Sequence, residues 1–154
     1  FQAPGLGALG YADSDRIAIY RAPLRQHTER TPFDVRGATD LPRVDMVVSY
    51  AGSDGALIDA ARAAGARGIV AAGFAPGFGS PGEVAALQRA LADGIVVVQG
   101  ARAHSGRVDA RDRIREAGFV AADNLSPQKA RVLLMLALTQ TRDRDAIQRM
   151  FWKF

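Results

Sequence analysis

Residues 124–138, NLSPQKARVLLMLAL, contain the clearest start of a helix in this chain. Ser126 stands at the N-cap position, where its hydroxyl can accept a hydrogen bond from a free amide of the first helical turn. Pro127 fits the first helical position, because the amide there has no partner inside the helix to lose. The residues that follow are apolar almost all round, so the sequence predicts a buried helix rather than one lying on the surface.

Outward from this helix, short apolar runs alternate with helical segments. Strands are predicted at residues 44–50, 68–72, 95–99 and 119–122, and helices at residues 55–64, 83–92 and 143–151, with a short helical turn at 111–117. Nearly continuous apolar strands that alternate with helices are typical of a parallel sheet covered on both faces. We therefore predict the α/β class for residues 44–154, as a three-layer Rossmann-like domain with a four-stranded parallel sheet.

A different pattern precedes residue 44. Residues 1–22 predict a β-hairpin, with a turn at Asp13-Ser14-Asp15 followed by alternating polar and apolar residues at 16–20. Residues 23–43 contain three prolines and show no sustained periodicity, which is typical of a linker. Because the chain begins with Phe1 rather than Met, we expect it to be a fragment, either a domain or one half of a cleaved enzyme.

The composition excludes several kinds of site and partner. The chain has no cysteine, which rules out disulfides and thiolate catalysis, and its two histidines are too few for a histidine-built metal site. No apolar run approaches the roughly 20 residues that span a bilayer, so no membrane partner is expected. Eighteen arginines and two lysines give a net charge of +4, but acids are interleaved with them, as in residues 142–145. Such a mixture is typical of a solvated helix face, so no nucleic acid partner is expected.

A glycine-rich loop, residues 73–82, follows the second predicted strand. Within it, the glycines from Gly77 to Gly82 satisfy the G-x-G-x-x-G pattern of dinucleotide sites. Gly77 lies several residues beyond the strand, Pro81 removes an amide that would face phosphate, and no acid follows the next strand to hold a ribose. Ligands of open α/β sheets bind outside the carboxyl ends of the strands, so this loop and residues 100–108 are predicted to form the functional edge.

Several segments together resemble one known family, the bacterial L-asparaginases and glutaminase-asparaginases, in both order and spacing. They are GALGY at residues 7–11, TPFDV at 31–35, LPRVDMV at 41–47, GIVAAG at 68–73, GFVA at 118–121 and NLSPQKARVLL at 124–134. The resemblance covers nearly the whole chain, and the last of these segments is its most specific part.

This resemblance implies an enzyme about twice as long as this chain. It hydrolyses the side-chain amide of L-asparagine to L-aspartate and ammonia, with L-glutamine as a second candidate substrate and without a metal or other cofactor. Residues 1–22 would end its N-terminal domain, residues 23–43 would link the domains, and residues 44–154 would form its C-terminal domain. The family's nucleophilic threonines lie in T-G-G-T and T-D-T motifs of the N-terminal domain. No segment here resembles them, so no catalytic residue is expected in this chain, which alone should be inactive.

The resemblance also implies an assembly and a shared site. These enzymes are homotetramers, built as dimers of intimate dimers, in the bacterial cytoplasm or periplasm. The C-terminal domain completes the site of a neighbouring subunit through an Asn in a G-N-G-N loop and a Glu in a later loop. Gly77 and Phe78 align with the first loop, with Phe78 in place of that Asn, and Asp109 and Asp112 are the carboxylates nearest to the Glu. These four residues are expected near the substrate, where Phe78 would wall the pocket or pack against the partner subunit.

Two other readings of the chain stay open at this point. One is a small-molecule or nucleotide-binding α/β module that uses the Gly73–Gly82 loop without chemistry. The other is a member of the same family that has lost activity and serves as a scaffold, which the replacement at Phe78 would favour.

Overall fold

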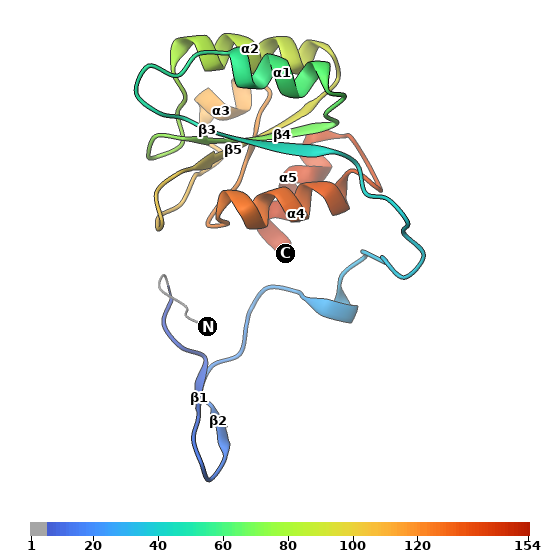
Figure 1. Ribbon diagram of the computed structural model, residues 1–154. Coiled ribbons are helices and arrows are strands. Elements are labelled where there is room, and N and C mark those ends of the chain that lie inside the picture. Colours follow the sequence, from blue (N-terminus) through green and yellow to red (C-terminus); the bar gives the residue numbers. More distant parts are fainter. Residues whose placement is uncertain (1–5) are drawn as a thin grey trace.

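Four parallel strands form the central sheet of the computed structural model, which describes residues 6–154 (Figure 1). They lie in the order β3 (Val44–Val48), β4 (Gly68–Gly73), β5 (Val96–Ala101) and β6 (Val120–Ala121). Val44 pairs with Gly68 and Gly68 pairs with Val96, so the strands begin at one edge of the sheet and end at the opposite edge. The predicted α/β fold with a four-stranded parallel sheet is confirmed.

Helices cover both faces of this sheet (Figure 1). One face carries α1 (Ala56–Ala63), α2 (Pro81–Ala92) and α3 (Asp112–Glu116), and the other carries α4 (Pro127–Ala137) and α5 (Arg144–Lys153). Successive strand residues point to opposite faces, so Val97 packs into the first apolar core and Val98 into the second. The first core includes Leu87 from α2, and the second includes the fully buried Leu134 and Phe151 from α4 and α5.

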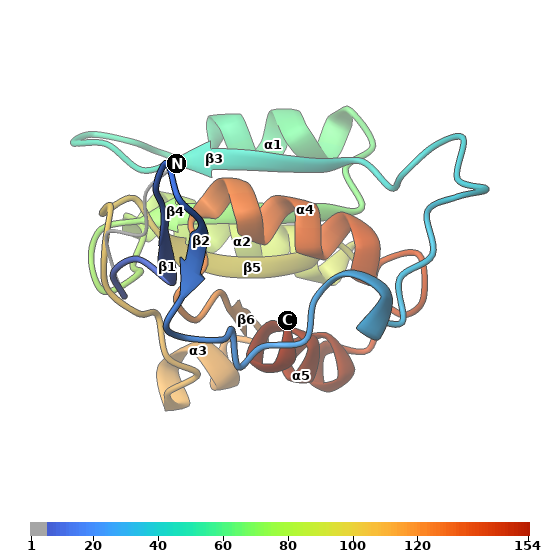
Figure 2. The same cartoon turned by 90° about the horizontal axis from the view of Figure 1, so that it is seen from below.

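The start of α4 confirms the helix signal in the sequence. Ser126 is the N-cap, its Oγ accepts a hydrogen bond from the Lys129 amide at 3.4 Å, and Pro127 is the first helical residue. The predicted burial on all sides is wrong, because Val132 is 51% exposed while Leu134 is fully buried. The reason is that α4 lies in an outer layer and packs on the sheet with one face only (Figure 2).

Helix α2 begins two residues earlier than predicted. Ser80 is its N-cap, with Ser80 Oγ accepting from the Glu83 amide at 3.1 Å and Glu83 Oε2 accepting from the Ser80 amide at 2.8 Å. This reciprocal pair is a capping box, and Pro81 again fits the first helical position. The Ser-Pro pair that marks the start of α4 therefore also marks the start of α2. It lies within residues 73–82, which the glycines led us to predict as a loop.

The N-terminal part of the described chain lies outside the three layers. Strands β1 (Gly10–Ala12) and β2 (Ile17–Ile19) form an antiparallel hairpin that projects from the α4 side of the sheet (Figure 1). The predicted hairpin included residues 1–5, which lie outside the described residues. Residues 21–43 contain one short 3-10 helix, η1 (Thr28–Arg30), and run along α4 and α5 to β3 (Figure 2).

This connecting segment is attached to the α/β layers by several contacts. The Gln26 amide donates to the Lys153 carbonyl at 3.3 Å, and the rings of Phe33 and Phe154 pack edge to face with centroids 5.2 Å apart. None of the helices formed by residues 6–154 combines the length and the apolar character needed to cross a bilayer.

Candidate functional site

The two loops expected to form the functional edge leave neighbouring strands. Strand β4 ends at Gly73 and β5 ends at Ala101, and the two strands are parallel and paired with each other. The Arg102 amide donates to the Gly73 carbonyl at 2.9 Å, so the strands stay together up to the point where the loops begin. The structure thus confirms that both loops lie at the carboxyl edge of the sheet, where open α/β sheets bind ligands.

The first loop is a tight turn that packs against the second. The Phe74 amide donates to the Phe78 carbonyl at 2.7 Å, and the Phe78 amide donates back to the Phe74 carbonyl at 2.8 Å. Gly77 between them has a φ of +114°, and a Cβ there would lie 2.9 Å from Val108 Cγ1 of the second loop. Only glycine combines this backbone conformation with so close an approach, so Gly77 allows the two loops to touch.

Two arginines hold the aromatic residues of the first loop. The guanidinium carbon of Arg113, in α3, lies 4.3 Å from the centroid of the half-buried Phe78 ring, within the range of a cation–π contact. Arg102 takes the same position over Phe74 at 4.5 Å, and its Nη1 donates to the Ser49 carbonyl at 3.0 Å. Neither arginine could be assigned a role from the sequence, since a contact between distant residues leaves no spacing pattern.

The two carboxylates expected near the substrate are both paired with arginines of their own segment. Asp109, in the second loop, accepts from Arg111 Nε at 2.6 Å, and this hydrogen bond lowers the pKa of Asp109 below its usual value. Asp112, the first residue of α3, accepts from Arg115 Nη2 at 2.5 Å. Both side chains remain partly exposed to solvent.

The structure brings the two loops together but not the four predicted residues themselves. Gly77 contacts the residue before Asp109, and Phe78 contacts the residue after Asp112. Within residues 6–154, neither carboxylate forms a hydrogen bond with Gly77 or Phe78. The edge is therefore lined by arginines and an aromatic ring, and both acids are already paired with arginines.

Asp123 is the residue at this edge that the sequence analysis missed. It follows β6, is 9% exposed, and has a φ of +55°, which is uncommon for a residue other than glycine. Its backbone bonds reciprocally with Val108 at 2.9 and 3.1 Å, which ties it to the second loop. Its carboxylate forms ion pairs with Arg25 of the connecting segment and Arg107 of the second loop. An acid directly after an apolar strand was the one signal that could have drawn attention to it.

The ion pairs decide the charge of Asp123. Burial by itself would raise the pKa of this carboxyl, but the hydrogen bond and charge of Arg107, the Asn124 amide and the charge of Arg25 outweigh it. The pKa therefore lies below its usual value of 3.8, and Asp123 is ionised at neutral pH. One charged carboxylate thus joins the second loop to the segment that precedes the α/β layers.

The glycine-rich pattern is explained by packing rather than by a nucleotide. A Cβ at Gly79 would lie 3.0 Å from Glu83 Oε2, so this glycine makes room for the capping carboxylate. Glu83 is buried and accepts from the Ser80 amide and from Ser49 Oγ, each at 2.8 Å. It occupies the helix N-terminus where a pyrophosphate would sit, which disfavours the nucleotide-binding alternative.

Metal ligands do not gather in the described part of the chain. Among residues 6–154, no group of three His, Cys, Asp or Glu side chains is placed to hold a metal ion.

Comparison with known proteins gives one consistent result. The family model described as the Glutaminase/Asparaginase C-terminal domain matches residues 43–151. A probable periplasmic L-asparaginase of Haemophilus influenzae is 39% identical over 156 residues, which cover 100% of this chain and 45% of that protein. L-asparaginase 2 of Escherichia coli is 40% identical over 153 residues, 98% of this chain and 44% of that protein.

A solved structure shows the same relationship in three dimensions. A probable cytoplasmic L-asparaginase of Campylobacter jejuni superposes with a TM-score of 0.95 at 39% identity, covering 99% of this chain and 50% of that one. The chain thus spans about half the length of the relatives that it matches.

Proposed function

This chain belongs to the glutaminase/asparaginase family, within its C-terminal domain, and we propose that the complete protein is an amidohydrolase. Its reaction is the hydrolysis of L-asparagine to L-aspartate and ammonia, with L-glutamine as a second substrate. The observation that carries this proposal is the identity of about 40% to named L-asparaginases over the whole length of the chain.

The nucleophile belongs to the part of the protein that this chain does not cover. In the proposed mechanism a threonine of the N-terminal domain attacks the amide carbon, ammonia leaves, and water then releases the acyl group from the threonine. Backbone amides stabilise the oxyanion that forms at each addition step. The absence of T-G-G-T and T-D-T segments from the 154 residues supports this division of roles.

The contribution of this chain is the wall of a neighbouring subunit's site. Gly77 and Phe78 form that wall together with the second loop, and in this proposal Asp109 and Asp112 also lie near the substrate. The cation–π contact of Arg113 with Phe78 and the close approach of Gly77 to the second loop support this role, because they fix the wall in position. Fixed walls matter because the substrate must be held in line with the attacking threonine.

The hairpin belongs to the N-terminal domain in this proposal, and residues 23–43 are the linker between the domains. Ile17, Ile19 and Tyr20 are 73%, 66% and 71% exposed, although all three are large and apolar or aromatic. A two-stranded hairpin is marginally stable by itself, so apolar side chains exposed on it support burial against a further domain. Residues 44–154 then form the C-terminal domain.

We also propose a homotetramer built from two intimate dimers. Met46 and Val48 on the edge strand β3 are 37% and 44% exposed, and Val132 on the adjoining helix α4 is 51% exposed. Such a grouping of apolar side chains on a surface is typical of an interface. Light scattering on the complete protein should give four times the mass of one subunit.

The activity is tested by measuring ammonia release from L-asparagine and L-glutamine with the complete protein. Turnover of L-asparagine that exceeds turnover of L-glutamine is the expected result. Complete protein that is folded and oligomeric but inert toward both amides would overturn the proposal and favour the scaffold reading.

A further inference from the structure

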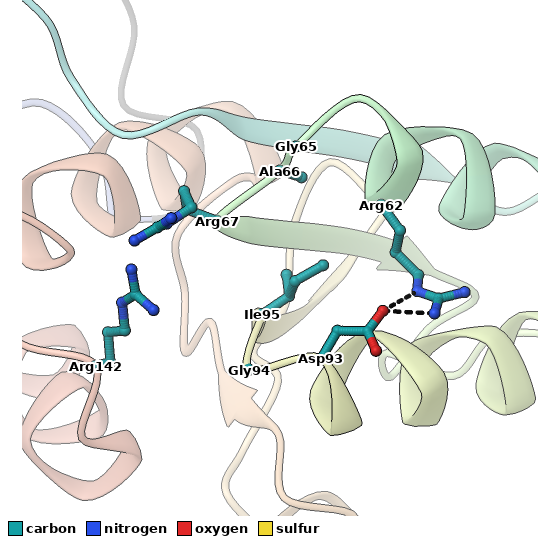
Figure 3. A pocket seen from close by; sticks show the side chains of 8 residues that line it. All are labelled: Arg62, Gly65, Ala66, Arg67, Asp93, Gly94, Ile95 and Arg142. Carbon is teal, nitrogen blue, oxygen red and sulfur yellow. Dashed lines mark hydrogen bonds and ion pairs between the residues drawn. The ribbon is translucent and has the colours of Figure 1, made fainter.

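A second charged feature lies at the opposite edge of the sheet, where β4 and β5 begin. The turns that follow α1 and α2 enclose a hollow of about 220 Å³ with the segment between α4 and α5 (Figure 3). It is lined by three arginines, Arg62, Arg67 and Arg142, and by one acid, Asp93. This edge is remote from the candidate site, because the strands run from one edge to the other.

The charges of Arg62 and Asp93 are already balanced. Arg62 donates to Asp93 Oδ2 through Nε at 3.0 Å and through Nη2 at 2.5 Å, and its Nη1 donates to Asp59 at 2.6 Å. Asp59 also pairs with Arg89 at 2.6 Å, so two arginines and two aspartates form a neutral network. This network leaves no net charge to offset the other two arginines of the hollow.

Arg67 and Arg142 are the uncompensated pair. Their guanidinium groups point toward each other across the hollow (Figure 3). Within residues 6–154, no hydrogen bond or ion pair joins either guanidinium to an acceptor. Two like charges that face each other repel, and an anion placed between them would add two attractions at shorter distance that outweigh this repulsion.

The ends of the two helices do not require these arginines. Gly65 and Gly94 have φ values of +81° and +76°, and their amides cap the Arg62 and Leu91 carbonyls at 3.0 and 2.9 Å. The Ala66 amide donates to the Ala61 carbonyl at 3.1 Å, and the Ile95 amide donates to the Ala90 carbonyl at 3.0 Å. These bonds complete the C-terminal capping of both helices. The helix carbonyls are thus satisfied by backbone, and both guanidinium groups remain available to a ligand.

We propose that this hollow binds a phosphate dianion between Arg67 and Arg142. A guanidinium presents planar pairs of N–H donors that match two oxygens of one phosphate, so two facing guanidinium groups can share a tetrahedral anion. A phosphate monoester carries a charge of about −1.5 to −2 at neutral pH, and two arginines favour the dianion of free phosphate as well, whereas one carboxylate offsets only one arginine. The hollow is smaller than the roughly 300–1,000 Å³ of sites for drug-sized ligands, so it fits the anion rather than a nucleotide.

Titration calorimetry and thermal unfolding with inorganic phosphate test this proposal, against sodium chloride at equal ionic strength. We expect phosphate to raise the Tm of the protein above the chloride control, and R67Q and R142Q each to weaken phosphate binding at least tenfold. The control is R16Q, which removes the same charge at the exposed hairpin turn and should bind phosphate as the unmodified chain does.

Further ligands identify the chemistry of the site. Methyl phosphate that binds better than inorganic phosphate assigns the hollow to phosphate esters, and the reverse order assigns it to free phosphate. Three results would each overturn the proposal. They are an equal effect of phosphate and chloride on the Tm, unchanged phosphate binding in folded R67Q and R142Q, and tighter binding of succinate than of both phosphates.

Discussion

Replacement of Asp123 by asparagine removes one charge and one of the two oxygens that accept hydrogen bonds from Arg25 and Arg107. The substitution keeps the size of the side chain, and asparagine tolerates the φ of +55° found at this position. What disappears is the carboxylate that pairs with Arg25 and Arg107. D123N therefore isolates the electrostatic attachment of the connecting segment and the second loop to the sheet edge.

The size of the effect follows from the exposure of the three side chains. Breaking a buried ion pair costs about 3–5 kcal/mol, because a charge is left without a partner. Here the Asp123 side chain is 10% exposed, but those of Arg25 and Arg107 are 30% and 61% exposed and can be hydrated again. We therefore expect D123N to lower the free energy of unfolding by about 2 kcal/mol. At about 2–4 °C per kcal/mol for a chain of this length, the Tm should fall by roughly 4–8 °C.

The pH dependence gives a second readout of the same carboxylate. The folded pKa of Asp123 lies below its usual value of 3.8, so its contribution to stability is present above that value and is lost as the pH falls through the folded pKa. The difference in unfolding free energy between the unmodified chain and D123N should be constant from pH 7 to about pH 5 and shrink below about pH 4.

Urea unfolding of three variants completes the test. The control is D34N, which removes an exposed carboxylate that pairs with Arg36 and should leave the unfolding midpoint nearly unchanged. D123A should lose about 1 kcal/mol more than D123N, because alanine tolerates a positive φ poorly. A midpoint for D123N equal to that of D34N would contradict this account, as would a difference between D123N and the unmodified chain that does not shrink as the pH falls below about 4.

Gly77→Ala should cost about 1–3 kcal/mol of unfolding free energy in urea, because both its φ and its contact with the second loop exclude a Cβ. Gly52→Ala shares the positive φ, of +82°, but meets nothing within 4 Å, so an equal cost in both variants would contradict the contact between the loops. Leu134→Ala should cost about 2–5 kcal/mol and Val132→Ala under about 0.5 kcal/mol, and equal costs would contradict the one-sided burial of α4. In the complete protein, Phe78→Asn should raise kcat/KM for L-asparagine by up to about tenfold, since it restores a hydrogen-bonding side chain to the wall. A folded variant with unchanged or lower kcat/KM would count against placing Phe78 beside the substrate.

The elements of the fold could be predicted because their signals are local. Apolar runs marked all four strands of the parallel sheet, and Ser126 with Pro127 marked the start of α4. Consecutive strands lie next to each other in the sheet, an order that the alternation of strands and helices allows but does not fix. Two predicted boundaries differ from the observed ones. Strand β5 ends two residues beyond the apolar run at 95–99, and α2 begins inside the glycine-rich loop.

The burial of α4 and the contacts of the candidate site depend on tertiary packing. Because apolar residues lie on all sides of α4, the sequence does not indicate which face of the helix meets the sheet. Val132 lies on the face that is turned away from the sheet. Arg25 and Asp123 are 98 residues apart in the sequence, and no pattern of spacing joins them. The loop that carries Gly77 could be located because strand ends are predictable, whereas the arginine that covers Phe78 comes from a different segment.

We propose that this chain walls a shared amide-hydrolysing site without supplying its nucleophile. Three measurements of ammonia release from L-asparagine decide this point: with the 154-residue chain alone, with a separately produced N-terminal part of the same protein, and with the two mixed. We expect neither part alone to release ammonia above background and the mixture to restore turnover. Turnover by the 154-residue chain alone, or by the N-terminal part at the rate of the mixture, would contradict the claim.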